Sequence, residues 1–301
     1  MNFGNRQKNN RFKKVIVTKK DITIQAEDGF PLAATLFVPQ DDTITQVVVI
    51  GSALGVPRYI YFKLARFFAQ NGCTALTFDY RGIHQSQNEN VSGSSIKMAD
   101  WGALDIDAVL AWANNEWQPQ KITYFGHSCG GQVLGLAQNA HNIDKAIFVA
   151  SQSGYWKLWE FPYRWGVCFI WYSLPLLTPW FDKFPARALG ISSVNIPSGV
   201  ARQWAEWGRS TNYLWDNINQ EALDRYNKLS FPLLSVGFTD DHFFGPPESV
   251  QKLLNYYPQT ESKVQIIAPS EINKKKVGHF GFLKDDFAHP LWNNWAQWLL
   301  T

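Results

Sequence analysis

The sequence predicts an α/β fold: a mostly parallel central sheet with helices on both faces and one helical insertion. Short apolar strand patterns alternate with helical patterns along most of the chain, the alternation stops at about residue 152, and it resumes at about residue 231. Strand–helix alternation indicates parallel strands joined by crossover helices. Because the same pattern stands on both sides of the interruption, we expect 152–228 to be an insertion in a single domain.

The first predicted elements are an antiparallel pair. Two segments with strand patterns, 15–27 and 32–38, flank Asp28-Gly29. An Asp-Gly pair readily adopts the positive φ that a tight hairpin requires.

The later elements alternate between strands and helices. Continuous apolar runs such as VVVI at 47–50 are typical of strands buried on both faces, and a stripe of apolar residues at helical spacing marks 99–115 as a helix. Strands are predicted at 47–50, 74–79, 121–125, 145–150, 231–238 and 263–267, and helices at 58–71, 99–115, 129–139, 248–256 and 290–300.

Length and charge limit the classes of protein. The chain has 301 residues, 46% of them apolar and 18% charged, which suffices for one large core. The formal net charge is +3, and much of it comes from the first twenty residues. These basic residues are Arg6, Lys8, Arg11, Lys13, Lys14, Lys19 and Lys20. We therefore expect a basic N-terminal tail at 1–20, a core at 21–151 and 229–301, and no nucleic-acid partner.

Hydropathy and cysteine content indicate the compartment. No apolar run reaches the roughly 18 residues of a membrane span, and the N-terminus lacks the apolar segment of a signal peptide. Cys73, Cys129 and Cys168 are odd in number, at spacings that fit neither a disulfide framework nor a zinc site. We expect reduced thiols and a cytoplasmic protein; the oligomeric state is left open.

The motif with the clearest chemistry is Gly126-His127-Ser128-Cys129-Gly130, which fits G-x-S-x-G. In that motif flanking glycines let a strand turn sharply into a helix and hold the serine hydroxyl on a strained backbone. Here a predicted strand ends just before the motif and a predicted helix begins just after it. Ser128 is therefore the candidate nucleophile; Cys129, one position further on, would be aimed into the fold.

From about residue 20 to its end, the chain resembles the α/β-hydrolase superfamily, and within it the serine-esterase-like, lipase-like or serine-aminopeptidase-like members. The segment from Asp79 to Ser86 is similar to the family's D-x-R-G-x-G-x-S loop, except that His84 replaces a glycine. In that family the catalytic residues follow the chain order serine, acid, histidine.

The resemblance implies positions for the acid and the base. The acid should follow the strand that resumes after the insertion, where 237–240 matches the family's G-x-x-D, so Asp240 is our choice and Asp241 the alternative. The base should lie in the loop after the last strand, where His279 stands between glycines. The other histidines lie elsewhere: His84, His127, His141, His242 and His289.

These residue types would act together in acyl transfer. An imidazole takes the proton of the weakly nucleophilic serine, and a carboxylate holds the imidazole in its tautomer. The oxyanion then needs two backbone donors. One is the N–H of Cys129; the other, in the loop 51–55, is that of Ala53 or Leu54. No metal or cofactor is expected, because the sequence has neither metal-ligand spacing, nor a P-loop, nor a dinucleotide fingerprint.

The insertion is rich in aromatic residues, and the family resemblance implies a cap over Ser128. Its aromatic and leucine side chains would line an acyl pocket or form the cap's own core. A lid that touches a membrane is a third interpretation of 165–177; Pro175 and a length short of a span speak against it.

The predicted function is hydrolysis of a carboxylic ester or thioester with an apolar acyl or aromatic portion, through an acyl-serine intermediate. The partner would be a small acyl substrate. The alternatives are an acyltransferase with the same triad and, in a different class, a binding protein that kept the fold without turnover.

Overall fold

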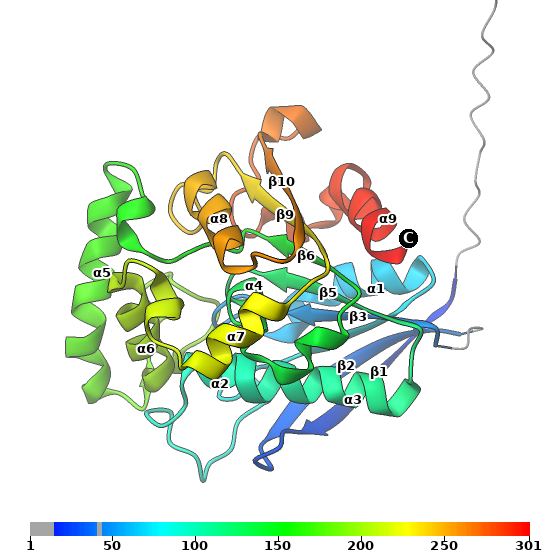
Figure 1. Cartoon of the computed structure of the whole chain (residues 1–301), viewed down its shortest axis with the longest axis horizontal. Helices are drawn as coiled ribbons and strands as arrows, with labels where there is room; N and C mark the ends of the chain where they lie inside the picture. The colour runs from blue at the N-terminus through cyan, green and yellow to red at the C-terminus, as the bar shows by residue number, and fades with distance from the viewer. Residues whose placement is uncertain (1–14, 41–43) are drawn as a thin grey trace, which may run out of the picture.

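A mixed sheet forms the centre of the molecule in the computed structural model, which describes residues 15–40 and 44–301 (Figure 1). Its eight strands lie in the order β1-β2-β4-β3-β5-β6-β9-β10. β2 pairs antiparallel with both β1 and β4, and the remaining neighbours are parallel. The strands are β1 (Val17–Gln25), β2 (Pro31–Pro39), β3 (Gln46–Gly51), β4 (Thr74–Phe78), β5 (Lys121–His127), β6 (Lys145–Val149), β9 (Pro232–Phe238) and β10 (Glu261–Ile267).

Most of the predicted tail, residues 1–14, lies outside the described residues. The structure corrects its other end, because Lys19 and Lys20 lie within β1 and pair with Phe37 and Leu36 of β2. The predicted strand at 15–27 therefore forms, and its first residues belong to the sheet and not to a tail.

Helices cover both faces of the sheet (Figure 1). They are α1 (Phe62–Gln70), α2 (Met98–Asp100), α3 (Asp107–Trp117), α4 (Cys129–Gln132), α8 (Pro247–Leu253) and α9 (Asn293–Leu300). Along β3, Val47 and Val49 join the core under α3, whereas Val48 and Ile50 join the core under α1 and α9. Burial on both faces explains why this strand has no polar side.

The helix predicted at 129–139 is much shorter than expected. α4 ends at Gln132, and two 3-10 turns, Leu134–Leu136 and Gln138–Asn142, follow it. Glycine has low helix propensity, and here it is required by close packing: a Cβ on Gly131 would collide with Ser151, and one on Gly135 with Tyr226. The two glycines that this packing requires lower the helix propensity of the segment, in keeping with the early end of α4.

The segment between β6 and β9 is mostly helical and lies beside one end of the sheet (Figure 1). It contains α5 (Tyr163–Leu177), α6 (Ser198–Arg209), α7 (Gln220–Lys228) and a small pair of strands, β7 (Lys183–Phe184) and β8 (Ile196–Pro197). Trp171 of α5 and Trp207 of α6 are buried between these elements and the core. Across the described ranges, no helix has the length and apolar character needed to cross a bilayer.

Candidate active site

The turn after β5 holds Ser128 in an unusual conformation. Its φ is +53° and its ψ −117°, a region that few non-glycine residues occupy. The Ser128 N–H donates to the carbonyl of Val149 on β6 at 3.0 Å. A Cβ on Gly130 would collide with the backbone of Gly51, so only glycine lets the turn approach β3 this closely. The sharp turn brings the Ser128 side chain to the wall of a cavity.

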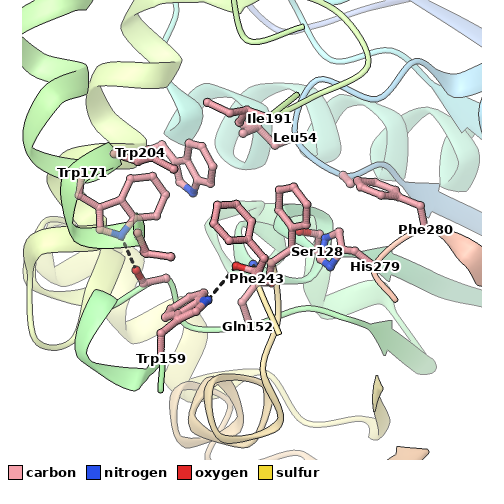
Figure 2. Close-up of a pocket in the computed structure, with 15 residues that line it drawn as sticks. Leu54, Ser128, Gln152, Trp159, Trp171, Ile191, Trp204, Phe243, His279 and Phe280 are labelled. Carbon is pink, nitrogen blue, oxygen red and sulfur yellow. Dashed lines mark hydrogen bonds between the residues drawn. The ribbon is translucent and has the colours of Figure 1, made fainter. Parts of the chain in front are cut away.

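His279 comes from the loop after β10 and lines the same cavity as Ser128. Figure 2 shows the two side chains next to each other. His279 is 6% exposed, and its Nδ1 lies 2.6 Å from Oδ2 of Asp241. Asp241 is itself only 3% exposed. The carboxylate therefore fixes the Nδ1–H tautomer and leaves Nε2 as the basic nitrogen.

The choice of Asp240 as partner of His279 is corrected by this geometry. Asp240 turns the other way, and its two oxygens accept the N–H groups of Val277 at 2.9 Å and Gly278 at 3.0 Å. Neighbouring residues on a tight turn point in different directions, so a shift of one position exchanges their roles. Asp240 holds the backbone of the loop that carries His279, whereas Asp241 holds its imidazole.

The two alternatives for the second oxyanion donor differ in their hydrogen bonds. The N–H of Ala53 donates to the Tyr61 hydroxyl at 2.8 Å and is already engaged. Within the part of the chain that the structure describes, the N–H groups of Leu54 and Cys129 donate to no protein acceptor. Leu54 and Ser128 both line the cavity, so the geometry favours Leu54 over Ala53.

A buried hydrogen-bonded chain links the loop after β3 to the loop of His279. The His127 Nε2 lies 3.0 Å from the carbonyl oxygen of His279, which can only accept, so Nε2 carries the proton. His127 Nδ1 then accepts from the Tyr61 hydroxyl at 2.7 Å, and that hydroxyl in turn accepts from Ala53. Burial, and next the neighbouring His279, hold the pKa of His127 well below its usual value, so the ring is neutral.

This series of hydrogen bonds connects the loop after β3, the turn of Ser128 and the loop of His279, and it was not predicted. The motif around Ser128 points to His127, but Tyr61 belongs to no motif and occupies an ordinary position in a predicted helix. Only the fold reveals their contact.

The cavity beside Ser128 is small and mostly apolar, with a volume of about 40 Å³. Space of that size holds roughly three water molecules. The insertion supplies much of its wall, including Trp159, Trp171 and Trp204, opposite Ser128 and His279 (Figure 2). The rings of Trp159 and Trp171 are fixed by hydrogen bonds, from Trp159 Nε1 to the carbonyl of Phe243 at 2.7 Å and from Trp171 Nε1 to that of Gly154 at 3.0 Å.

Gln152 is a polar exception in this wall. Its side-chain nitrogen donates to the carbonyl of Phe244 at 2.8 Å. Its Oε1 is buried and accepts no hydrogen bond from the described residues. A buried acceptor without a partner is costly, so this atom is available to a donor group of a bound molecule.

Cys129 is buried beneath the site, and burial raises its pKa. A thiol that resists ionisation is a poor nucleophile. Its Sγ faces the carbonyl of Ser52 at 3.4 Å, away from any role in attack.

The departure at His84 has a structural explanation. His84 has a φ of +44°, in the left-handed region that glycine adopts without steric strain. Its Nδ1 lies 3.2 Å from Oδ2 of the buried Asp79. The loop thus keeps the backbone shape that the family's glycine would allow.

The remaining histidines are not gathered at this site. His242 stacks on Tyr163 with ring centres 5.6 Å apart, and His141 bonds to the nearby carbonyl of Gln138. Over residues 15–40 and 44–301, no group of three or more His, Cys, Asp or Glu side chains is arranged to hold a metal ion.

Comparison with known proteins supports the fold. Residues 46–166 match the family model described as the alpha/beta hydrolase fold. A comparison of the sequence with curated proteins gives no significant match. Among solved structures, an esterase from Exiguobacterium antarcticum is similar at a TM-score of 0.61 and 15% identity, covering 94% of this chain and 100% of that one.

Two further structures are similar over most of their length. An esterase from Pyrococcus furiosus has a TM-score of 0.59 and 17% identity, covering 94% of this chain and 90% of the other. A dienelactone hydrolase from Anabaena variabilis has a TM-score of 0.56 and 13% identity, covering 94% and 97%. The chain therefore has the α/β-hydrolase fold, and residues 46–166 match the family model of that fold.

Proposed function

We propose that this protein is a serine hydrolase that cleaves a small carboxylic ester or thioester through an acyl-Ser128 intermediate. The observation that carries the proposal is the hydrogen bond between His279 and Asp241 beside a strained serine on one shared cavity. A fold by itself does not determine a function, whereas this arrangement of residue types is suited to one kind of chemistry.

In the proposed mechanism, His279 Nε2 accepts the hydroxyl proton of Ser128 as the oxygen attacks the acyl carbon. Asp241 stabilises the imidazolium that forms. The N–H groups of Cys129 and Leu54 donate to the oxyanion of the tetrahedral intermediate. His279 then protonates the leaving alcohol or thiol. In the second half, His279 takes a proton from water as the water oxygen attacks the acyl carbon. The imidazolium then gives the proton to Ser128 Oγ as the acyl–oxygen bond breaks and the acid leaves.

The wall of the cavity supports a substrate class. Its tryptophans favour an apolar or aromatic acyl group, and its volume of about 40 Å³ favours a short one. The free Oε1 of Gln152 would accept a hydrogen bond from an O–H or N–H on the substrate.

The direct test is hydrolysis of p-nitrophenyl esters of increasing acyl length by the full chain and by Ser128→Ala. We expect acetate or butyrate to be cleaved with a higher kcat/KM than octanoate, and Ser128→Ala to lose at least about 10³-fold in kcat. Turnover retained by Ser128→Ala would refute the nucleophile. If a dilute alcohol takes the acyl group in preference to water, the protein is an acyltransferase instead.

A further inference from the structure

The outer side of α5 exposes a continuous row of large apolar side chains. Trp165, Phe169, Tyr172 and Leu176 are spaced by four, three and four residues, which places them on one face of a helix. Their exposed fractions are 61%, 73%, 56% and 73%, and Trp180, just beyond the helix, is 83% exposed. We call these five residues the α5 stripe. In Figure 1, α5 lies at the margin of the molecule, away from α9.

The opposite side of α5 is apolar as well. Val167, Trp171 and Leu174 are buried against the rest of the protein, and between residues 161 and 181 the only charged residue is Arg164. A helix that is apolar all round is normally covered on every side, and a contiguous exposed apolar patch on a monomer marks an interaction site. The α5 stripe therefore requires a partner that covers it.

The charges around the α5 stripe indicate the nature of that partner. Residues 155–209 contain six Lys or Arg against three Asp or Glu, a net charge of +3. Lys157, Arg164 and Arg187 are exposed, and the Arg209 guanidinium lies 5.7 Å over the ring of Tyr172. One of the acids, Asp182, is occupied by hydrogen bonds from Ser92 and Gly93. Aromatic rings bordered by cations complement an anionic surface with an apolar interior.

We propose that the α5 stripe docks on an anionic lipid bilayer. Trp and Tyr rings favour the headgroup level of a membrane, and each nearby Lys or Arg adds attraction to anionic lipids. With 15 residues and Pro175 inside it, α5 is too short to cross a bilayer and would lie parallel to its plane. Those two features, held above against a lid that touches a membrane, rule out a helix that spans the bilayer but are compatible with one that rests on its surface.

A second copy of the chain fits the stripe less well. In a two-fold contact the same patch meets itself, so two surfaces of net positive charge would be brought together. Like charges facing each other across an interface are unfavourable. An anionic bilayer has no such conflict.

Docking would place the candidate active site close to the membrane. Val167, Ile170 and Trp171, on the inner side of α5, line the cavity that contains Ser128. One helix would thus contact lipid with one face and the cavity with the other. The docking itself does not depend on the proposed hydrolase activity.

The test is flotation of the full chain with vesicles of phosphatidylcholine alone and of phosphatidylcholine mixed with phosphatidylglycerol. We expect binding to the mixed vesicles and little to the neutral ones. The combined variant Trp165→Gln/Phe169→Gln/Trp180→Gln should bind at least about tenfold more weakly, since each buried aromatic ring contributes roughly a factor of ten or more. Val264→Ser, which changes an exposed apolar residue on β10, is the matched control and should bind like the wild type.

Two results would overturn the proposal. If the combined variant binds the mixed vesicles as tightly as the wild type, basic residues elsewhere in the chain carry the binding. If the wild type binds no vesicles, and sedimentation velocity shows a dimer that the combined variant dissociates, a second copy covers the stripe. Circular dichroism and the melting temperature verify that each variant is folded, and ester hydrolysis, measured separately, tests the function.

Discussion

Two adjacent carboxylates at the candidate site have different tasks. Asp241 accepts a hydrogen bond from His279 Nδ1. Asp240 accepts hydrogen bonds from the backbone N–H groups of the two residues that precede His279. The sequence places an acid in this turn, but it does not determine which of two neighbours faces the histidine. That depends on the path of the turn in space, which two bonds to Val277 and Gly278 fix.

Asp241→Asn should therefore reduce kcat far more than Asp240→Asn. An asparagine at 241 favours the wrong tautomer of His279, a change that costs about 10⁴-fold in a catalytic triad. Asp240→Asn keeps one acceptor for the loop and should cost about tenfold or less in kcat, with some loss of stability. Steady-state kinetics on a short-chain ester measure both effects. A larger loss from Asp240→Asn would restore Asp240 as the acid.

His127 should make stability fall in mild acid. Its pKa in the folded protein lies well below the ordinary value of 6.5 because the ring is buried. The unfolded chain therefore binds a proton that the folded protein does not. The contribution of His127 to the free energy of unfolding is at its full value above pH 6.5. It declines as the pH falls below 6.5, by up to about 1.4 kcal/mol per pH unit.

The measurement compares urea unfolding of the wild type and of His127→Gln between about pH 7 and pH 5. Glutamine keeps an acceptor for Tyr61 and a donor for the carbonyl of His279 but does not titrate. The wild type should lose stability more steeply than the variant. Parallel curves would show that His127 is not held neutral in the folded protein.

At the scale of elements, the strands were predictable and the helix after Ser128 was not. Apolar runs and alternation locate β3, β5 and β9 because burial on the sheet acts at each position. α4 ends at Gln132, and in the 3-10 turn that follows, Tyr226 fills the space beside Gly135, a contact between residues far apart in the sequence. The antiparallel pair at the start was predicted from Asp28-Gly29, and the predicted strand at 15–27 contains β1.

The loop after β4 provides a prediction at this scale. Asp79 is fully buried and accepts from the backbone N–H of Arg58 at 2.6 Å and from its guanidinium. Asp79→Asn leaves that buried guanidinium with only the exposed Asp21, at 3.9 Å, as a counter-charge and should lower the free energy of unfolding by about 3 kcal/mol. Urea unfolding measures the change.

Asp285→Asn is the control for this prediction. It breaks the pair with Lys63, whose side chains are 63% and 65% exposed, and should cost at most about 1 kcal/mol. If the two substitutions lower the free energy of unfolding equally, the buried pair of Asp79 and Arg58 contributes no more to stability than an exposed one.

At the scale of the whole molecule, the insertion and the sheet together form one cavity. The abundance of tryptophan in 152–228 predicts an aromatic segment. It does not tell Trp204, which lines the cavity, from Trp207, which packs in the core. That distinction requires the orientation of α6 on the sheet. The exposed face of α5 is hidden in the sequence for the same reason, because its inner and outer faces are equally apolar.

Trp204→Ala should enlarge the cavity and shift the preference toward longer acyl groups. Trp204 packs edge-on against Trp171, with ring centres 4.3 Å apart, and removing the indole leaves space for several methylene groups. The ratio of kcat/KM for octanoate to that for butyrate should rise at least about tenfold. Trp117→Ala, on α3 and outside the cavity, should leave the ratio unchanged. No change in Trp204→Ala would show that the acyl group binds elsewhere.

The central claim is that Ser128 is an activated nucleophile. Treatment of the full chain with a fluorophosphonate, followed by mass spectrometry of its peptides, tests this claim most directly. We expect a single adduct on Ser128, formed rapidly in the wild type and at least about 10²-fold more slowly in Asp241→Asn. A folded protein that carries no adduct on Ser128, or one labelled equally fast in both forms, would contradict it.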